Sequence, residues 1–196
     1  MREFTGWLTG AAFVAMLNVA PSSAQAAQRP VLSWTSLTAG IGPAGASSHR
    51  DTVYEGSGQS FAVIAYARQL APMRALDFEV LGGRPFGAGD CIPGSTICAP
   101  AFNYVGASAG LLTSPGGPIG PDRFLAGIGA GVFRVAPSES HAVSPRPALG
   151  LHAMLDVPVI VGTHAALAVG IHGLVFRLVH GQSLGMALLT TSLRVW

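Results

Sequence analysis

The feature that most constrains this chain is a series of eight short segments in which apolar residues recur at every second position. Successive side chains of a β-strand point to opposite faces, so a period of two indicates strands with one apolar face. Leu76, Phe78 and Val80 share one face, for example, while Asp77 and Glu79 share the other. Glycines and prolines punctuate the sequence between the segments, which favours an all-β fold. The predicted strands are centred on residues 34–41, 59–68, 75–82, 102–112, 124–135, 148–157, 164–176 and 184–195.

The composition indicates that this sheet does not face water on all sides. Charged residues make up only 10% of the chain, and none of them is lysine. An ordinary soluble domain carries ~25% charged residues, so there are too few here to cover a water-facing surface. The net charge of +2 and the absence of basic clusters argue against nucleic acid as a partner.

The first 26 residues are predicted to be a cleavable export signal, followed by a single domain over residues 27–196. Arg2 supplies the positive start, residues 7–20 form an apolar run, and Pro21 ends it before a stretch of small residues. The run of ~14 residues is shorter than the ~20 that a membrane-spanning helix needs.

Strand length favours a closed sheet in a membrane. Most of the predicted strands are close to the ~9–11 residues that a tilted transmembrane strand needs. In hydrocarbon every backbone N–H and C=O has to be bonded inside the protein, and a closed barrel achieves this. A helix over residues 157–179 is the competing interpretation, but Pro158 and three glycines weaken it.

The connections between the strands differ in length in a nearly alternating way. Long connections are expected at 43–58, 83–101 and 136–147, and short ones at 69–74 and 158–163. Long outer loops and short periplasmic turns are typical of outer-membrane barrels. Two connections depart from the pattern. Residues 113–123 are longer than a periplasmic turn, and residues 177–183 are shorter than an outer loop.

The glycine-rich segment Gly127–Phe133 and the final Ser192-Leu193-Arg194-Val195-Trp196 complete this pattern. With them, the chain resembles the small eight-stranded outer-membrane β-barrel proteins of the OmpA, OmpX and OmpW kind. The resemblance implies an antiparallel up-and-down barrel in the outer membrane of a Gram-negative bacterium. It also implies an aromatic final residue that the assembly machinery recognises. Trp196 supplies the aromatic ring, although it shares strand parity with Arg194 and not with Leu193 and Val195.

Six polar residues are predicted to project into the barrel and to form a polar network: Asp77, Glu79, His152, Asp156, His172 and Arg194. The acids are expected to pair with Arg194 or Arg68, because a buried charge is tolerated only when it is paired. His164 is predicted on the same face as His152 and His172. His164 and His172 lie roughly 26 Å apart along one strand at ~3.3 Å per residue, so they cannot share a metal. No metal or other cofactor is expected.

Cys91 and Cys98 flank a Pro-Gly turn, and an exported protein meets an oxidising compartment, so we expect a local disulfide. Two cysteines cannot complete a structural zinc site. Serine and histidine come close in sequence at residues 138–141 and 180–183, but neither spacing places a nucleophile beside its base on one strand face.

The sequence therefore predicts a protein that is not an enzyme. We expect a structural or surface-interaction role through the long outer loops, with outer-membrane lipid as the surrounding partner. Three alternatives stay open. They are a narrow, porin-like channel or carrier for small or lipophilic solutes, a soluble periplasmic β-barrel that binds a ligand, and an outer-membrane acyl hydrolase.

Overall fold

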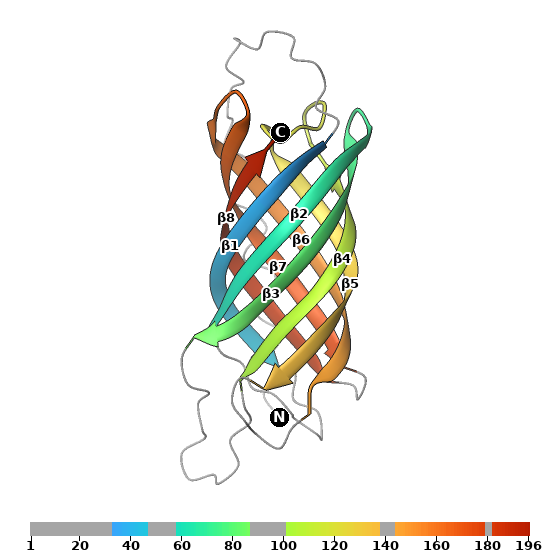
Figure 1. Ribbon diagram of the computed structural model, residues 1–196, viewed down its shortest axis with the longest axis vertical. Helices are drawn as coiled ribbons and strands as arrows, with labels where there is room; N and C mark the ends of the chain where they lie inside the picture. Colours follow the sequence, from blue (N-terminus) through green and yellow to red (C-terminus); the bar gives the residue numbers. More distant parts are fainter. Residues whose placement is uncertain (1–32, 47–57, 87–100, 138–143, 179–181) are drawn as a thin grey trace, which may run out of the picture.

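The computed structural model describes residues 33–46, 58–86, 101–137, 144–178 and 182–196. It is a closed barrel of eight antiparallel strands, each paired with its neighbours in sequence, and β1 closes the circle by pairing with β8 (Figure 1). The prediction of an all-β, up-and-down barrel of eight strands is confirmed. The strands are β1 (Ser33–Ala46), β2 (Gly58–Ala71), β3 (Arg74–Phe86), β4 (Phe102–Thr113), β5 (Leu125–Pro137), β6 (Arg146–Val161), β7 (Ala165–Leu178) and β8 (Ser183–Val195). The predicted export signal at residues 1–26 lies outside the described residues.

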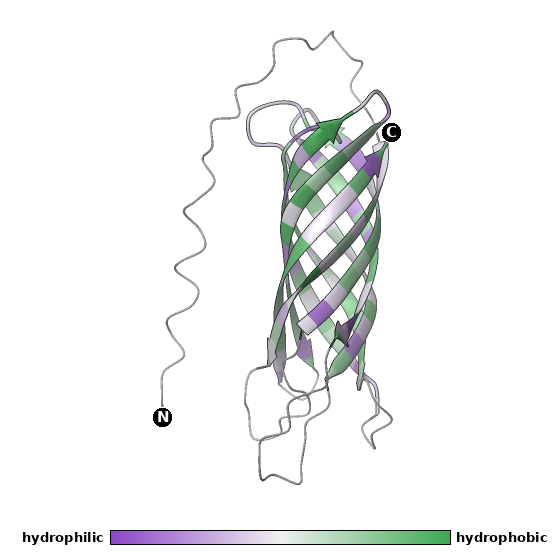
Figure 2. Ribbon diagram, turned by 90° about the vertical axis from the view of Figure 1, so that its left-hand side faces the viewer, coloured by the Kyte–Doolittle hydropathy of each residue, from purple (hydrophilic) through white to green (hydrophobic). Residues whose placement is uncertain are grey.

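Apolar residues recur along every strand (Figure 2), and the side chains exposed on the outer wall are largely apolar. The predicted alternation holds: Phe78 and Val80 point outward while Asp77 and Glu79 are buried inside. Large apolar side chains stay exposed on every strand, including Ile128, Leu149 and Leu189, each at 69%. A water-soluble monomer rarely exposes a continuous apolar surface of this extent, whereas lipid requires one. In the described part of the chain, no helix is long and apolar enough to cross a membrane.

The two ends of the barrel differ. One end, here called the turn end, carries the C-terminus and the β2–β3, β4–β5 and β6–β7 connections; it is at the top of Figure 1. The other end, here called the loop end, is where the β1–β2, β3–β4, β5–β6 and β7–β8 connections leave the sheet. The strands extend up to five residues further toward the loop end than the sequence predicted. Glycine and proline, which mark loops in most sequences, lie there within strands.

The interior contains two apolar layers with polar residues between them. The layer at the loop end is built mainly from aromatic and leucine side chains, among them Phe61, Phe102, Tyr104, Phe133 and Phe176. The layer at the turn end comprises Trp34, Ala67, Ala75, Leu112, Ile119, Leu125 and Met154. The loop half of the interior is therefore filled by large apolar side chains, and its aromatic rings pack at centroid distances of 4.7–6.4 Å.

Candidate functional site

The candidate site is the polar layer at mid-height in the barrel, here called the polar belt. Its members are Thr38, Asp77, Glu79, Ser108, His152, Asp156, His172, Thr190, Ser192 and Arg194, all of them buried. They come from six different strands, and the strand period of two turns each of them inward. The belt includes the six residues that the sequence predicted to form an interior polar network.

Glu79 on β3 organises one half of the belt. Its carboxylate accepts a hydrogen bond of 2.7 Å from the Ser108 hydroxyl on β4. The Nδ1 atom of His152 on β6 lies 3.3 Å from the same carboxylate oxygen. Asp77 sits two residues away on the same inner face and interacts with the carboxyl of Glu79. These contacts join β3, β4 and β6 across the interior, so they fix how the walls pack against one another.

Asp156 on β6 organises the other half. One carboxylate oxygen is 3.2 Å from Nε2 of His172. The other accepts hydrogen bonds from Ser192 at 3.1 Å and from Arg194 at 3.0 Å. Because Ser192 donates its only hydroxyl hydrogen to Asp156, the 2.7 Å contact between Ser192 and Thr38 has Thr38 as its donor. Asp156 is therefore charged, paired and fully satisfied, as a buried carboxylate has to be.

Arg194 extends this network to the β4–β5 connection, residues 114–124, which folds into the turn end. Its guanidinium donates to the backbone carbonyls of Pro121 at 3.0 Å and Arg123 at 2.9 Å. In the same connection Ile119 joins the apolar layer, and its N–H donates to Pro72 in the β2–β3 turn at 2.6 Å. This connection is longer than a periplasmic turn because it covers the mouth of the barrel, and we call it the plug.

Glycines make room for the large members of the belt. Gly129 on β5 faces His152 in register, and a Cβ at Gly129 would overlap the imidazole. Gly170 on β7 faces Asp156 in register, and a Cβ there would overlap the carboxylate. β6 can therefore place two bulky polar side chains inside a narrow barrel only because each neighbouring strand has a glycine at the same height.

The space that remains in the belt is small. A cavity of about 20 Å³ lies between the belt and the layer at the turn end, lined by residues such as Thr38, Glu79 and Asp156. That volume holds about one water molecule. Among the described residues, no group of three or more His, Cys, Asp and Glu side chains is placed to hold a metal ion. The belt has the hydrogen bonding of a packed polar core, with no room for a substrate.

The fold was compared with known proteins. No family model matches this chain, and no curated protein matches it. Among solved structures, Neisserial surface protein A (NspA) is similar with a TM-score of 0.57 and 13% sequence identity, over 82% of this chain and 96% of that one. Ail, the attachment invasion locus protein of Yersinia pestis, is similar with a TM-score of 0.49 and 13% identity, over 84% of this chain and 99% of that one.

This chain has the fold of a small eight-stranded outer-membrane β-barrel. The likeness extends over nearly the whole length of NspA. At 13% identity the likeness establishes the fold and leaves function to be argued from the residues.

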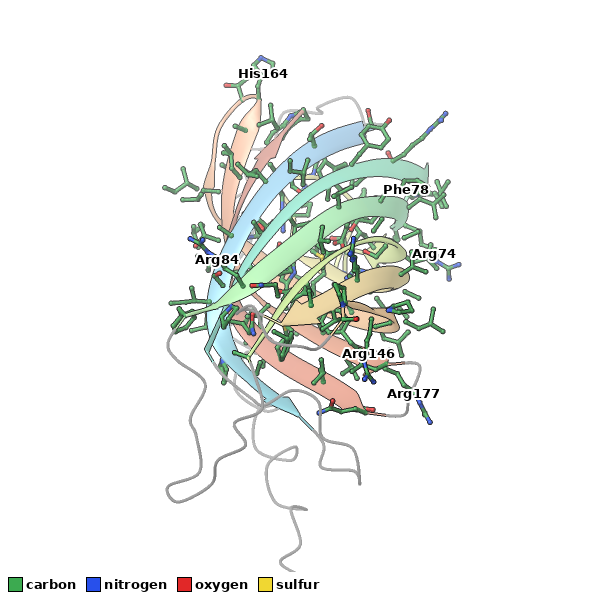
Figure 3. All side chains as sticks on the ribbon, turned by 60° about the horizontal axis from the view of Figure 1, so that its bottom comes forward. Arg74, Phe78, Arg84, Arg146, His164 and Arg177 are labelled. Carbon is green, nitrogen blue, oxygen red and sulfur yellow. The ribbon has the colours of Figure 1, made fainter. Side chains whose placement is uncertain are left out.

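Other residues singled out in the sequence have different positions. Arg68, the other basic partner considered for the acids, points outward and is exposed, because it lies on the outer parity of β2. Arg134 is likewise exposed on the outer face of β5. The prediction that His164 faces inward is wrong: it lies in the exposed β6–β7 turn, where its carbonyl accepts a hydrogen bond from the N–H of Trp196 (Figure 3). Trp196 packs against the apolar layer at the turn end.

The remaining candidates fall wholly or partly outside the described residues. Cys91 and Cys98 lie in the segment 87–100, so their disulfide stays a prediction. Residues 138–141 and His180 also lie outside, while Ser183 begins β8. Sequence reasoning missed the hydroxyl partners Thr38, Ser108 and Ser192. Only the register of the strands brings them to the carboxylates.

Proposed function

We propose that this protein is a non-enzymatic barrel of the Gram-negative outer membrane that works by surface contact through the connections at its loop end. The observation that carries the proposal is the combination of an apolar outer wall with an interior filled at three levels. The wall makes lipid the solvent of the barrel. The filled interior leaves the ends of the barrel as the places where a partner can bind.

The lengths of the connections support the loop end as that place. Residues 47–57 and 87–101 join strands there, whereas residues 72–73 and 162–164 suffice at the turn end. Loops on a rigid scaffold are where binding usually resides, because they vary without disturbing the fold. The plug is a long connection at the turn end, but it is folded inward, and two of its backbone carbonyls accept hydrogen bonds from Arg194.

The same observations count against the alternatives. A channel would have to pass the aromatic layer, the belt and the plug, and eight strands leave an interior just filled by side chains. A soluble ligand-binding barrel would place its apolar face inside, whereas residues such as Ile64, Leu149 and Leu151 are exposed on the outside. A hydrolase would need a nucleophile that a substrate can reach, but Ser108 and Ser192 are buried in the belt, beside a cavity of about 20 Å³.

Protease treatment of intact cells tests the proposal. We expect cleavage within residues 47–57 or 87–101, with the strands remaining protected and migrating as a heat-modifiable barrel on gels. We also expect no conductance from the purified protein in planar bilayers. Cleavage that occurs only after the outer membrane is permeabilised, or steady single-channel currents, would contradict the proposed role.

A further inference from the structure

The pairing between β3 and β4 stops before the loop end is reached. β3 pairs with β2 as far as Phe86, but its last partner in β4 is Tyr104, opposite Gly83. Within the part of the chain that the structure describes, residues 84–86 are therefore paired with β2 and not with β4, and the arrowhead of β3 points away from the start of β4 in Figure 1. Pro85 has no N–H to donate, which suits a strand edge. The barrel wall is thus split at this point.

The inner side of the split is closed by side chains. Gln59 on β2 is fully buried, and its Nε2 donates to the carbonyl of Phe102 on β4 at 3.1 Å. β2 and β4 are not neighbours in the sheet, so this bond passes behind the free end of β3. The Tyr104 ring packs against Gly83 from within. A molecule that enters the split from outside therefore meets a wall and does not reach the interior.

A groove of about 450 Å³ lies on the outer face of the barrel at the split. Ligand sites range over roughly 300–1,000 Å³, so the groove is large enough for part of a lipid. Its floor consists of Phe61, Ala62, Gly82 and Gly83, which are small or apolar. Ser60, Arg84 and Asn103 add polar groups to the lining.

Among the described residues, Arg84 is the charged side chain that lines the groove, and its charge is positive. Arg84 is exposed and projects from the end of β3 (Figure 3). Of the acidic residues that the structure describes, Asp77, Glu79 and Asp156 are buried inside the barrel, and Asp122 pairs with Arg123 at the turn end. None of these four lines the groove. An arginine at a membrane interface extends its stem along apolar surface and forms paired hydrogen bonds to phosphate.

We propose that the groove binds an anionic lipid of the outer leaflet, with an acyl chain along Ala62 and Gly82 and its phosphate at Arg84. The proposal rests on the membrane position proposed above, because only a barrel in the bilayer presents this face to lipid. The apolar floor contacts the acyl chain and the guanidinium of Arg84 binds the phosphate, so the groove recognises both parts of one lipid.

Photochemical cross-linking in vesicles tests the groove. The folded barrel is placed in phosphatidylcholine vesicles that contain a little phosphatidic acid with a diazirine on one acyl chain. After illumination, adducts are mapped by mass spectrometry. We expect several-fold more labelling of residues 60–62 and 82–84 than of Ile128, Ala130 and Val132, which face outward on β5. Even labelling around the wall would overturn the proposal.

Matched variants separate the two parts of the site. Ala62→Phe fills the groove and should reduce labelling there to the level of the β5 wall. Ala130→Phe makes the same change on the outer face of β5 and should leave groove labelling unchanged. Arg84→Gln should remove the preference for phosphatidic acid over a phosphatidylcholine probe, whereas Arg177→Gln, an exposed arginine of β7, should preserve it.

Each outcome has a defined meaning. If Ala62→Phe and Ala130→Phe label alike, or if Arg84→Gln keeps the head-group preference, the groove is not a lipid site. If Ala62→Phe does not fold, as judged by its heat-modifiable migration, the comparison of the two arginine variants decides. Protein that does not float with the vesicles contradicts the proposed function, whereas floating protein with even labelling contradicts only the groove.

Discussion

Replacing Arg194 with methionine should destabilise the barrel strongly at its turn end. Arg194 is 1% exposed and donates to Asp156, Pro121 and Arg123. Removing one partner of a buried ion pair costs about 3–5 kcal/mol, because the other charge is left uncompensated. Asp156 keeps its contacts with His172 and Ser192, so we expect a loss near the lower end, about 3 kcal/mol.

Urea unfolding in lipid vesicles, followed by tryptophan fluorescence, measures this loss. Trp34 belongs to the apolar layer at the turn end and Trp196 packs against it, so both report on the region that changes. Arg177→Met removes an exposed arginine from the loop end and should stay within about 0.5 kcal/mol of the parent.

A double-mutant cycle isolates the ion pair from the plug contacts. Asp156→Asn combined with Arg194→Met removes the uncompensated carboxylate, so the double variant should be more stable than the sum of the single losses by about 0.5–3 kcal/mol. The carbonyls of Pro121 and Arg123 stay without the guanidinium in both backgrounds, so proteolysis within residues 114–124 should rise in both. A loss below about 1 kcal/mol for Arg194→Met, or strict additivity, would refute the argument.

Three further predictions follow from the wall, the belt and the loop end. Gly129→Ala should cost about 1–3 kcal/mol in urea unfolding because its methyl group overlaps His152, and adding His152→Ala should recover part of that loss. Leu151→Arg, on the outer face of β6, should cost about 2–4 kcal/mol in a bilayer, whereas an effect below about 0.5 kcal/mol would indicate a water-facing wall. Maleimide should label Cys91 and Cys98 of the purified protein only after reduction; labelling without a reductant would exclude the disulfide.

The sequence predicted strand faces well where the inner face is polar. In β3 the acids Asp77 and Glu79 alternate with Phe78 and Val80, and only one assignment avoids placing carboxylates in lipid. In β2 the same reasoning does not decide which face is inside, because both faces carry apolar residues. Val63 faces the interior there and Ile64 faces outward. Both faces of β2 are apolar because its outer face meets lipid and its inner face packs into the apolar layer at the loop end.

The sequence identified the members of the belt but not their partners. The sequence offered both Arg68 and Arg194 as ion-pair partners of the interior acids. The closed barrel decides between them, because Arg194 faces inward and Arg68 faces outward. The length of residues 113–123 was a visible departure from a short turn. The guanidinium that holds this connection lies 73 residues away from Pro121, beyond the reach of any local pattern. The split at β3 was likewise concealed by reading Gly83 to Pro85 as loop.

The hydrogen bond between Thr38 and Ser192 joins β1 to β8, the two strands whose pairing closes the barrel. Arg194, the counter-ion of Asp156, is also carried by that last strand. The contact of Asp156 with Arg194 therefore exists only when β8 is in place beside β1 and β7. Closing the barrel and pairing this buried carboxylate with a guanidinium thus depend on the same strand, which favours the complete sheet over a partial one.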